Sequence, residues 1–514
     1  MIGAIINLAR LVRIGHTLAR HNALVPILSL STGSSTGLGL VRRVSRANSD
    51  LRPGVRLVAA FQELGPTFIK LGQAMSVRAD LVGDELAADL SALQDRLPSF
   101  PSADAKSIIE EELGTPIEEL FQQFDEEPVA AASIAQVHFA VTNEGQKVAV
   151  KVLRPGIEER FQQDINLLFW LARTCERFRP RLRRLRLVEV VLEFQNTVSL
   201  EMDLSFEGAA ASELRENFKD DQEFRVPEVD WLRTARRVLT IDRVDGVSID
   251  EVEVLKRAGQ DVGDILARSA RAFFNQVFRD GFFHADMHPG NMFVTPDGAL
   301  VPVDFGIMGR LDRRTRFYLA DMLIGFLERD YRRVAEVHFQ AGYVPQDQSI
   351  DSFMLACRSI GEPIFGKPMH EISIANLFEK LFRITERFEM QTQPQLLLLQ
   401  KTMLVAEGVG RKLDPSSNMW VLAQSMIEAW MLEHRGPEAR VREVVNDAIS
   451  GISRLPSVIS RTEQVVDMLR NEGLRLHPDS SLAFTKKERW CGPGLFFLLV
   501  LAMFLFGIYA IIRG

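Results

Sequence analysis

His284-Ala285-Asp286-Met287-His288-Pro289-Gly290-Asn291 is followed, after two short extended stretches, by Asp304-Phe305-Gly306. An aspartate placed like Asp286 can orient or deprotonate a nucleophile during phosphoryl transfer. Asn291 and Asp304 supply oxygen ligands of the kind that Mg²⁺ prefers. Each residue alone could belong to an ordinary surface turn. All of them in this order favour a phosphoryl-transfer site with Asn291 and Asp304 as metal ligands and Asp286 as a catalytic residue.

A β-hairpin lies upstream of this stretch. Residues 134–141 and 146–153 are both strand-like, and Thr142-Asn143-Glu144-Gly145 forms the turn between them. The second strand carries Lys151 in Val-Ala-Val-Lys, the form in which a kinase lysine meets the α- and β-phosphates of a nucleotide. A solvated strand lysine is the alternative, but the position of Lys151 ahead of the 284–291 stretch favours the catalytic interpretation.

The lysine of such a site pairs with an acid on a helix. A helical stretch is predicted for residues 157–214, and it offers Glu201 and Asp203 as candidates. We place Glu201 in the catalytic set with Lys151 and Asp286. Glu207 and Glu213 compete for the same pairing, and the sequence does not decide between them.

The segment expected over the phosphates contains alanines where ordinary kinases have glycines. It reads Val129-Ala130-Ala131-Ala132-Ser133-Ile134. Alanine permits a close approach of the backbone but disfavours the positive φ angles that glycine allows. Nucleotide binding through Ala130, Ala131, Ala132, Ser133 and Lys151 is expected, with ATP and Mg²⁺ as cofactors. The alanines put phosphorylation of a protein hydroxyl in question.

A small sheet-bearing part followed by a larger helical part predicts an α+β, bilobal, protein-kinase-like fold. Further strands are expected near residues 237–241, 292–295 and 300–303. The predicted divisions are an N-terminal helical extension (1–100), a sheet-bearing lobe (101–245), a helical lobe (246–415), a helical connector (416–490) and a transmembrane anchor (491–512).

A net charge of −7 argues against bulk affinity for nucleic acid, and three scattered cysteines fit a reducing compartment.

The C-terminal run from Cys491 to Ile512 holds 22 consecutive uncharged residues. A helix of that length would cross the hydrocarbon layer of a bilayer, about 30 Å thick. Basic residues precede the run, so the positive-inside rule predicts a single-pass anchor with the kinase-like domain in the cytoplasm.

Six arginines between Arg177 and Arg186 form either a solvated helix face or a contact with anionic lipid.

The alanine-rich segment, the Glu201-x-Asp203 acids, the 284–291 stretch and the DFG triplet together resemble the UbiB family of atypical kinases. The helical segment Lys70-Leu71-Gly72-Gln73 matches the K-x-G-Q signature of that family. The resemblance covers about residues 55–415. It implies that the N-terminal extension folds over the active site, with Lys70, Gln73 and Asp203 in regulatory roles. Some bacterial members carry two terminal hydrophobic spans, whereas one is visible here.

The resemblance further implies an ATPase, or a kinase acting on a lipid or small molecule, that supports ubiquinone biosynthesis at a membrane. Membrane lipid or a polyprenyl quinone precursor, and enzymes of ubiquinone biosynthesis, are the implied partners. Two alternatives stay open: a nucleotide-gated lipid-binding scaffold with little catalysis, and a small-molecule phosphotransferase of the aminoglycoside or choline kinase type. The K-x-G-Q segment, the alanines and the terminal apolar run count against the second.

Overall fold

The structure is a computed structural model of the chain. It describes residues 2–23, 52–76, 83–90, 93, 97–178, 187–363, 383–385, 387–390, 393–414 and 430. The chain divides into two compact units, residues 1–424 and 425–514. The helices and strands of the described residues lie in the first unit.

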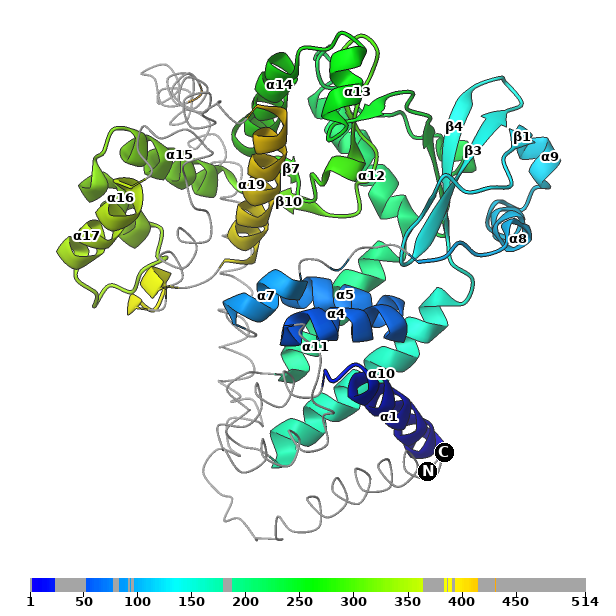
Figure 1. Ribbon diagram of the computed structural model, residues 1–514, viewed down its shortest axis with the longest axis horizontal. Coiled ribbons are helices and arrows are strands. Elements are labelled where there is room, and N and C mark those ends of the chain that lie inside the picture. Colours follow the sequence, from blue (N-terminus) through cyan, green and yellow to red (C-terminus); the bar gives the residue numbers. More distant parts are fainter. Residues whose placement is uncertain are drawn as a thin grey trace, which may run out of the picture. The chain divides into compact units, whose positions relative to one another are not determined.

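A five-stranded antiparallel sheet forms the smaller lobe (Figure 1). Its order is β1 (Phe121–Phe124), β3 (Ala135–Thr142), β4 (Lys147–Leu153) and β5 (Val238–Asp242), with β2 (Ala130–Ala131) also paired to β3. The β3–β4 turn closes at Gly145, which has a φ of +86° and thus uses a conformation that favours glycine. The predicted hairpin is confirmed within one residue at each strand end.

One face of this sheet packs on α8 (Ser102–Leu113), with α9 (Ile117–Leu120) leading into β1. Val148, Val150 and Val152 of β4 contribute to that core with Ile109 of α8. Because side chains alternate along a strand, Lys151 must point to the opposite face. There it meets the long helical region that follows the hairpin.

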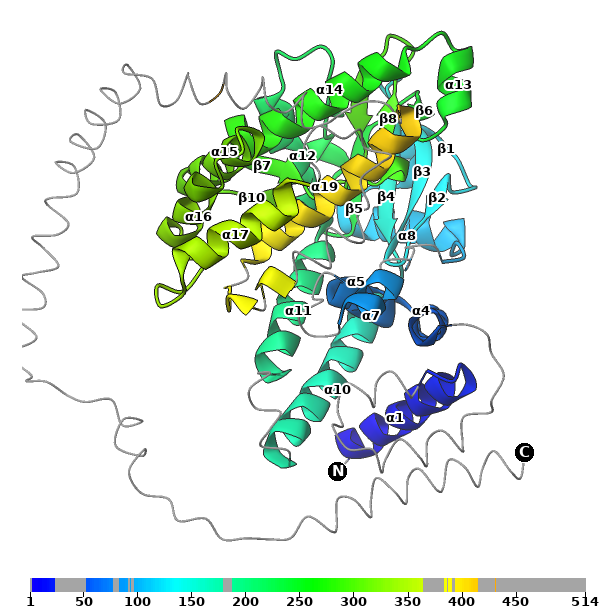
Figure 2. The ribbon, with the colours of Figure 1, turned by 60° about the vertical axis from the view of Figure 1, so that its left-hand side comes forward.

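That helical region is not the single stretch expected for residues 157–214. Its described parts are α10 (Ile157–Phe178), α11 (Leu187–Glu201) and α12 (Leu204–Asn217). Figures 1 and 2 show α10 and α11 side by side. Helix α11 ends at Glu201, and Asp203 caps the start of α12 by accepting a hydrogen bond from the Ser205 amide at 3.1 Å. Serine and aspartate near a helix start favour such a break.

The N-terminal extension contains α1 (Ile2–Arg20), α4 (Pro53–Leu64), α5 (Pro66–Ser76) and α7 (Asp84–Leu90). They share an apolar core that includes Leu57, Phe61, Phe68 and Leu90. Helix α5 carries the Lys70–Gln73 segment and contacts both α10 and α11. Thr67 of α5 donates a 2.7 Å hydrogen bond to Asp164 of α10, so the extension is tied to that helix.

The larger lobe begins with β6 (Val247–Ser248), α13 (Val252–Arg257) and α14 (Val262–Phe274), which continues into a π-helical turn, η3 (Asn275–Asp280). Strand β7 (Phe282–His284) pairs with β10 (Met308–Arg310), and β6 pairs with the hairpin of β8 (Met292–Val294) and β9 (Leu300–Pro302). Residues 284–291 begin at the last residue of β7, and Asp304-Phe305-Gly306 lies between β9 and β10. The short strands β1, β2, β6, β7 and β10 were not predicted.

Helices complete the larger lobe. They are α15 (Arg313–Leu327), α16 (Tyr331–Gln340), α17 (Ile350–Gly361) and α19 (Pro394–Leu413). Figure 2 shows α19 running along α14, and it also contacts β10.

Among the described residues, no helix combines the length and the apolar character needed to cross a bilayer. The predicted anchor at residues 491–512 lies outside the described residues, as does most of the arginine run after Phe178.

Candidate active site

A buried ion pair joins the sheet to α12. The Lys151 Nζ lies 2.7 Å and 2.9 Å from the two carboxylate oxygens of Glu207. It also lies 3.4 Å from Oδ1 of Asp304. The Phe305 amide donates to the same Glu207 carboxylate at 3.3 Å. Glu207 therefore holds together the β4 lysine and the start of the DFG segment.

The charges of this cluster depend on one another. Burial alone would lower the pKa of Lys151, but the carboxylates of Asp304 and Glu207 outweigh it and the pKa is raised. Burial would raise the pKa of Asp304, yet Lys151 and the Gly306 amide hold that pKa well below its usual range. Burial raises the pKa of Glu207 against the opposing effect of Lys151. Lys151 is thus cationic and Asp304 anionic at neutral pH.

Glu201, placed in the catalytic set as one candidate for the acid partner of Lys151, does not contact that lysine in this structure. Glu201 ends α11 and pairs instead with Lys70 at 3.0 Å. Asp203 caps α12, and Glu213 accepts a 2.8 Å hydrogen bond from Arg310. The helix break at Met202 and Asp203 causes this division, because it puts Glu201 and Glu207 on different helices. The competing candidate Glu207 makes the contact.

The 284–291 segment brings Asp286 and Asn291 together. The Asn291 side-chain amide donates to the Asp286 backbone carbonyl at 3.2 Å, which leaves its own oxygen as an acceptor. The Asp286 amide donates to Nδ1 of His284 at 3.1 Å. Burial lowers the pKa of His284, so its imidazole is neutral and can accept this bond. Lys401 of α19 approaches the Asp286 carboxylate, with its Nζ 3.5 Å from Oδ1.

The alanine-rich segment is held as a short strand rather than an open loop. Ala130 and Ala131 form β2 and pair with Val137 and Gln136 of β3. The carbonyl of Ala132 accepts hydrogen bonds from the Arg154 guanidinium at 2.7 Å and 3.1 Å.

Ser133 does not fit the predicted nucleotide contact in this conformation. It is fully buried, so its hydroxyl is out of reach of a ligand arriving from solvent. Among the described residues its Oγ has no hydrogen-bond partner. The three alanines are at least partly accessible and remain candidates for facing the phosphates.

Lys70, Gly72 and Gln73 of the K-x-G-Q segment each make a different kind of contact. Lys70 forms the ion pair with Glu201, and both side chains are largely buried. Gln73 donates to the Leu93 carbonyl at 3.4 Å. A Cβ on Gly72 would lie 2.2 Å from a methyl carbon of Leu93 and 2.8 Å from the Phe61 ring. The glycine is therefore needed for packing, whereas the lysine brings charge to the site.

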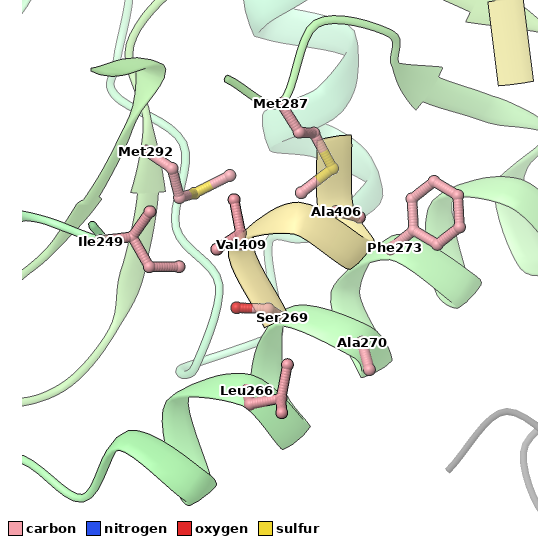
Figure 3. Close-up of a pocket in the computed structure, with 9 residues that line it drawn as sticks. All are labelled: Ile249, Leu266, Ser269, Ala270, Phe273, Met287, Met292, Ala406 and Val409. Atoms are coloured by element: carbon pink, nitrogen blue, oxygen red, sulfur yellow. The ribbon is translucent and has the colours of Figure 1, made fainter. Parts of the chain in front are cut away.

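A small apolar cavity of about 30 Å³ is lined in part by the 284–291 segment (Figure 3). Met287 of the 284–291 segment and Met292 of β8 face it, and Phe273 and Val409 face it from α14 and α19. Sites for small molecules usually enclose several hundred Å³, so this cavity cannot hold a nucleotide. It is separate from the Lys151, Glu207 and Asp304 cluster.

The chain matches the family model of the ABC1 atypical kinase-like domain over residues 92–338 and that of the UbiB helical domain over residues 357–418. The solved structure of Rv3197 with erythromycin, from Mycobacterium tuberculosis, is similar with a TM-score of 0.51. It shares 23% identity and covers 76% of this chain and 98% of that one. The fold and the first domain thus define a kinase-like protein of the atypical class.

Two curated relatives identify the family within this class of kinase-like proteins. A protein of Marinobacter nauticus named "Probable protein kinase UbiB" is 41% identical over 94% of this chain and 90% of its own length. A protein of the same name from Pseudomonas aeruginosa is 44% identical over 78% of this chain and 76% of its own length. The chain belongs to the UbiB family of atypical kinases.

The Lys151–Glu207 pair predicts unequal effects for two substitutions on the same helix. Glu207→Gln leaves Lys151 buried with Asp304 as its remaining counter-charge, and should lower the free energy of unfolding by about 3 kcal/mol. Glu213→Gln breaks an exposed pair and should cost at most about 1 kcal/mol. Urea unfolding midpoints of both variants test this difference. Equal losses would contradict the assignment of Glu207 as the buried partner.

Proposed function

We propose that the chain binds Mg·ATP next to Lys151 and transfers its γ-phosphoryl group to water, a lipid or a small molecule. The observation that carries this proposal is the placement of Lys151 between Glu207 and Asp304. A β-strand lysine paired with a helix acid, beside the DFG aspartate, is what a kinase needs to hold nucleotide phosphates. Asp286 then orients or deprotonates the attacking group.

The donor set at this site fits a magnesium ion. Asp304 supplies a carboxylate that stays ionised and is 43% exposed, and Asn291 supplies an amide oxygen. Both are hard oxygen ligands. Magnesium, when bound there, would neutralise charge on the nucleotide phosphates. The chain itself contributes the two ligands, the Lys151 cation and the Asp286 carboxylate.

Three features favour an acceptor other than a protein. Alanines stand where glycines usually cover the phosphates, Arg154 restrains the Ala132 carbonyl, and Lys70 ties the extension to Glu201. Membership of the UbiB family supports a role in ubiquinone biosynthesis, and the partners we propose are membrane lipid, a polyprenyl quinone precursor or enzymes of that pathway. A nucleotide-gated lipid-binding scaffold is the competing function. ATP turnover by the purified protein, with and without lipid vesicles, separates the two, because a scaffold binds nucleotide without sustained turnover.

Replacement of the metal-binding aspartate should abolish the response to nucleotide. Asp304→Asn removes an anionic ligand, so the increase in melting temperature caused by Mg·ATP should largely vanish. Chelation of magnesium in the wild type should have the same effect. Asp297→Asn, in the exposed turn between β8 and β9, serves as the matched control. An undiminished increase in the Asp304 variant would rule out this site assignment.

Loosening the alanine-rich segment should change what the site can phosphorylate. Ala131→Gly gives the backbone the conformations used by ordinary kinases, and Lys70→Ala releases the contact with Glu201. Each should alter nucleotide affinity and increase autophosphorylation, measured as phosphate incorporated from labelled ATP. Ala341→Gly, at the end of α16, is the control. Robust phosphorylation of generic proteins by the wild type would instead make this an ordinary protein kinase.

We further propose that residues 491–512 anchor the protein in a membrane, with the kinase-like domain in the cytoplasm. The 22-residue uncharged run and its basic flank support this proposal. Truncation after Glu488 should release the protein into the soluble fraction or leave it bound only peripherally. If the truncated protein still resists extraction with alkaline carbonate, the single anchor is excluded.

A further inference from the structure

We infer that Lys401, from the helical domain, is a positioning residue that sets the Asp286 carboxylate for phosphoryl transfer. The inference rests on the proposed function and adds to it a cation from outside the kinase-like domain. Residue 401 falls in the segment matched to the UbiB helical domain, whereas Asp286 falls in the kinase-like domain.

The contact between Lys401 and Asp286 is placed by its neighbours. Lys401 Nζ lies 3.5 Å from Asp286 Oδ1, at the long end of hydrogen-bond range but within ion-pair range. The next residue, Thr402, is fully buried, and its hydroxyl proton is shared between the Ala285 carbonyl at 3.1 Å and the Leu398 carbonyl of its own helix at 2.9 Å. Consecutive residues of α19 therefore contact consecutive residues of the 284–291 segment. These contacts fix the position of the Lys401 backbone relative to Asp286.

The other lysines of the site are already engaged. Lys151 is held by Glu207 and Asp304, and Lys70 by Glu201. The segment from His284 to Asn291 contains no lysine or arginine of its own. Lys401 thus brings to Asp286 a positive charge that the segment does not carry. The two side chains are 31% and 34% exposed, so the pair lies where a substrate can approach.

A cation at this point has two physical effects. It restrains the Asp286 carboxylate in one orientation, and correct orientation of a reacting group can be worth about a hundredfold in rate. It also reduces the repulsion between that carboxylate and the negative γ-phosphate. The first effect does not require Lys401 to contribute to ground-state binding of the nucleotide, and the second acts on bound Mg·ATP as well as on the transition state, at a partly exposed pair where solvent weakens it. Its loss should therefore lower kcat far more than it changes KM.

The test compares three full-length variants in steady-state ATP turnover. Lys401→Met keeps an unbranched apolar stem without the charge, and Lys401→Arg keeps the charge. Lys412→Met is the control on the same helix, where Lys412 is 60% exposed and lies 3.8 Å from Asp250. We expect Lys401→Met to lower kcat by about 10- to 100-fold while KM for Mg·ATP changes less than about threefold. Stabilisation by Mg·ADP should be unchanged, Lys401→Arg should recover most of the activity, and Lys412→Met should behave as wild type.

If Lys401→Met has the kcat of the wild type, this inference is overturned and the proposed function is not. A loss of Mg·ADP stabilisation parallel to the loss of kcat would also overturn it, because that pattern marks a general structural role. A similar loss in Lys412→Met would overturn it for the same reason. A wild-type protein that is stabilised by Mg·ATP but does not turn it over would overturn both this inference and the proposed catalysis.

Discussion

The ion pair between Lys151 and Glu207 constrains most of what surrounds it. Two opposite charges buried together are tolerable only when both are fully satisfied. The sheet must present Lys151 on the face away from α8, and α12 must begin at the right point to present Glu207. The DFG segment must lie close enough for the Phe305 amide and the Asp304 carboxylate to complete the set. One contact thus fixes a strand, a helix and a loop relative to one another.

A second lysine and acid repeat this arrangement one helix earlier. Lys70 of α5 meets Glu201 at the end of α11, six residues before Glu207. The helix break between the two acids lets each address a different lysine, one from the N-terminal extension and one from the sheet. The Lys70 charge also contributes to the low pKa of Asp304. The extension therefore acts electrostatically on the cluster of Lys151, Glu207 and Asp304 and is more than a neighbouring group of helices.

The sequence was most informative where local pattern and chemistry agree. Alternating apolar residues and a glycine turn were enough to predict the hairpin, whereas the roles of Asn291 and Asp304 as metal ligands and of Asp286 as a catalytic residue stay predictions. The acid partner of Lys151 could not be chosen, because Glu201, Asp203, Glu207 and Glu213 lie within four turns and the choice depends on where a helix breaks. Asp203 followed by Ser205 was the available signal, since such residues favour a helix start.

Other features depend on contacts between distant segments. The burial of Ser133 and the hydrogen bonds from Arg154 to Ala132 follow from tertiary packing, which no local pattern reports. The two- and three-residue strands β2, β6, β7 and β10 are too short to show a period in sequence. Lys401 lies 115 residues after Asp286, so nothing in its immediate surroundings connects it to the site.

The contacts between α19 and the 284–291 segment bear on how the two domains of this family can be inherited. Thr402 contacts Ala285, and Lys401 contacts Asp286. A recombination event that exchanged one domain without the other would therefore break the contact of a buried hydroxyl and an ion pair. Selection would then act on the two segments as one hereditary unit, although they match separate family models. The helical domain would be expected to diverge in step with the kinase-like domain rather than drift as an independent appendage.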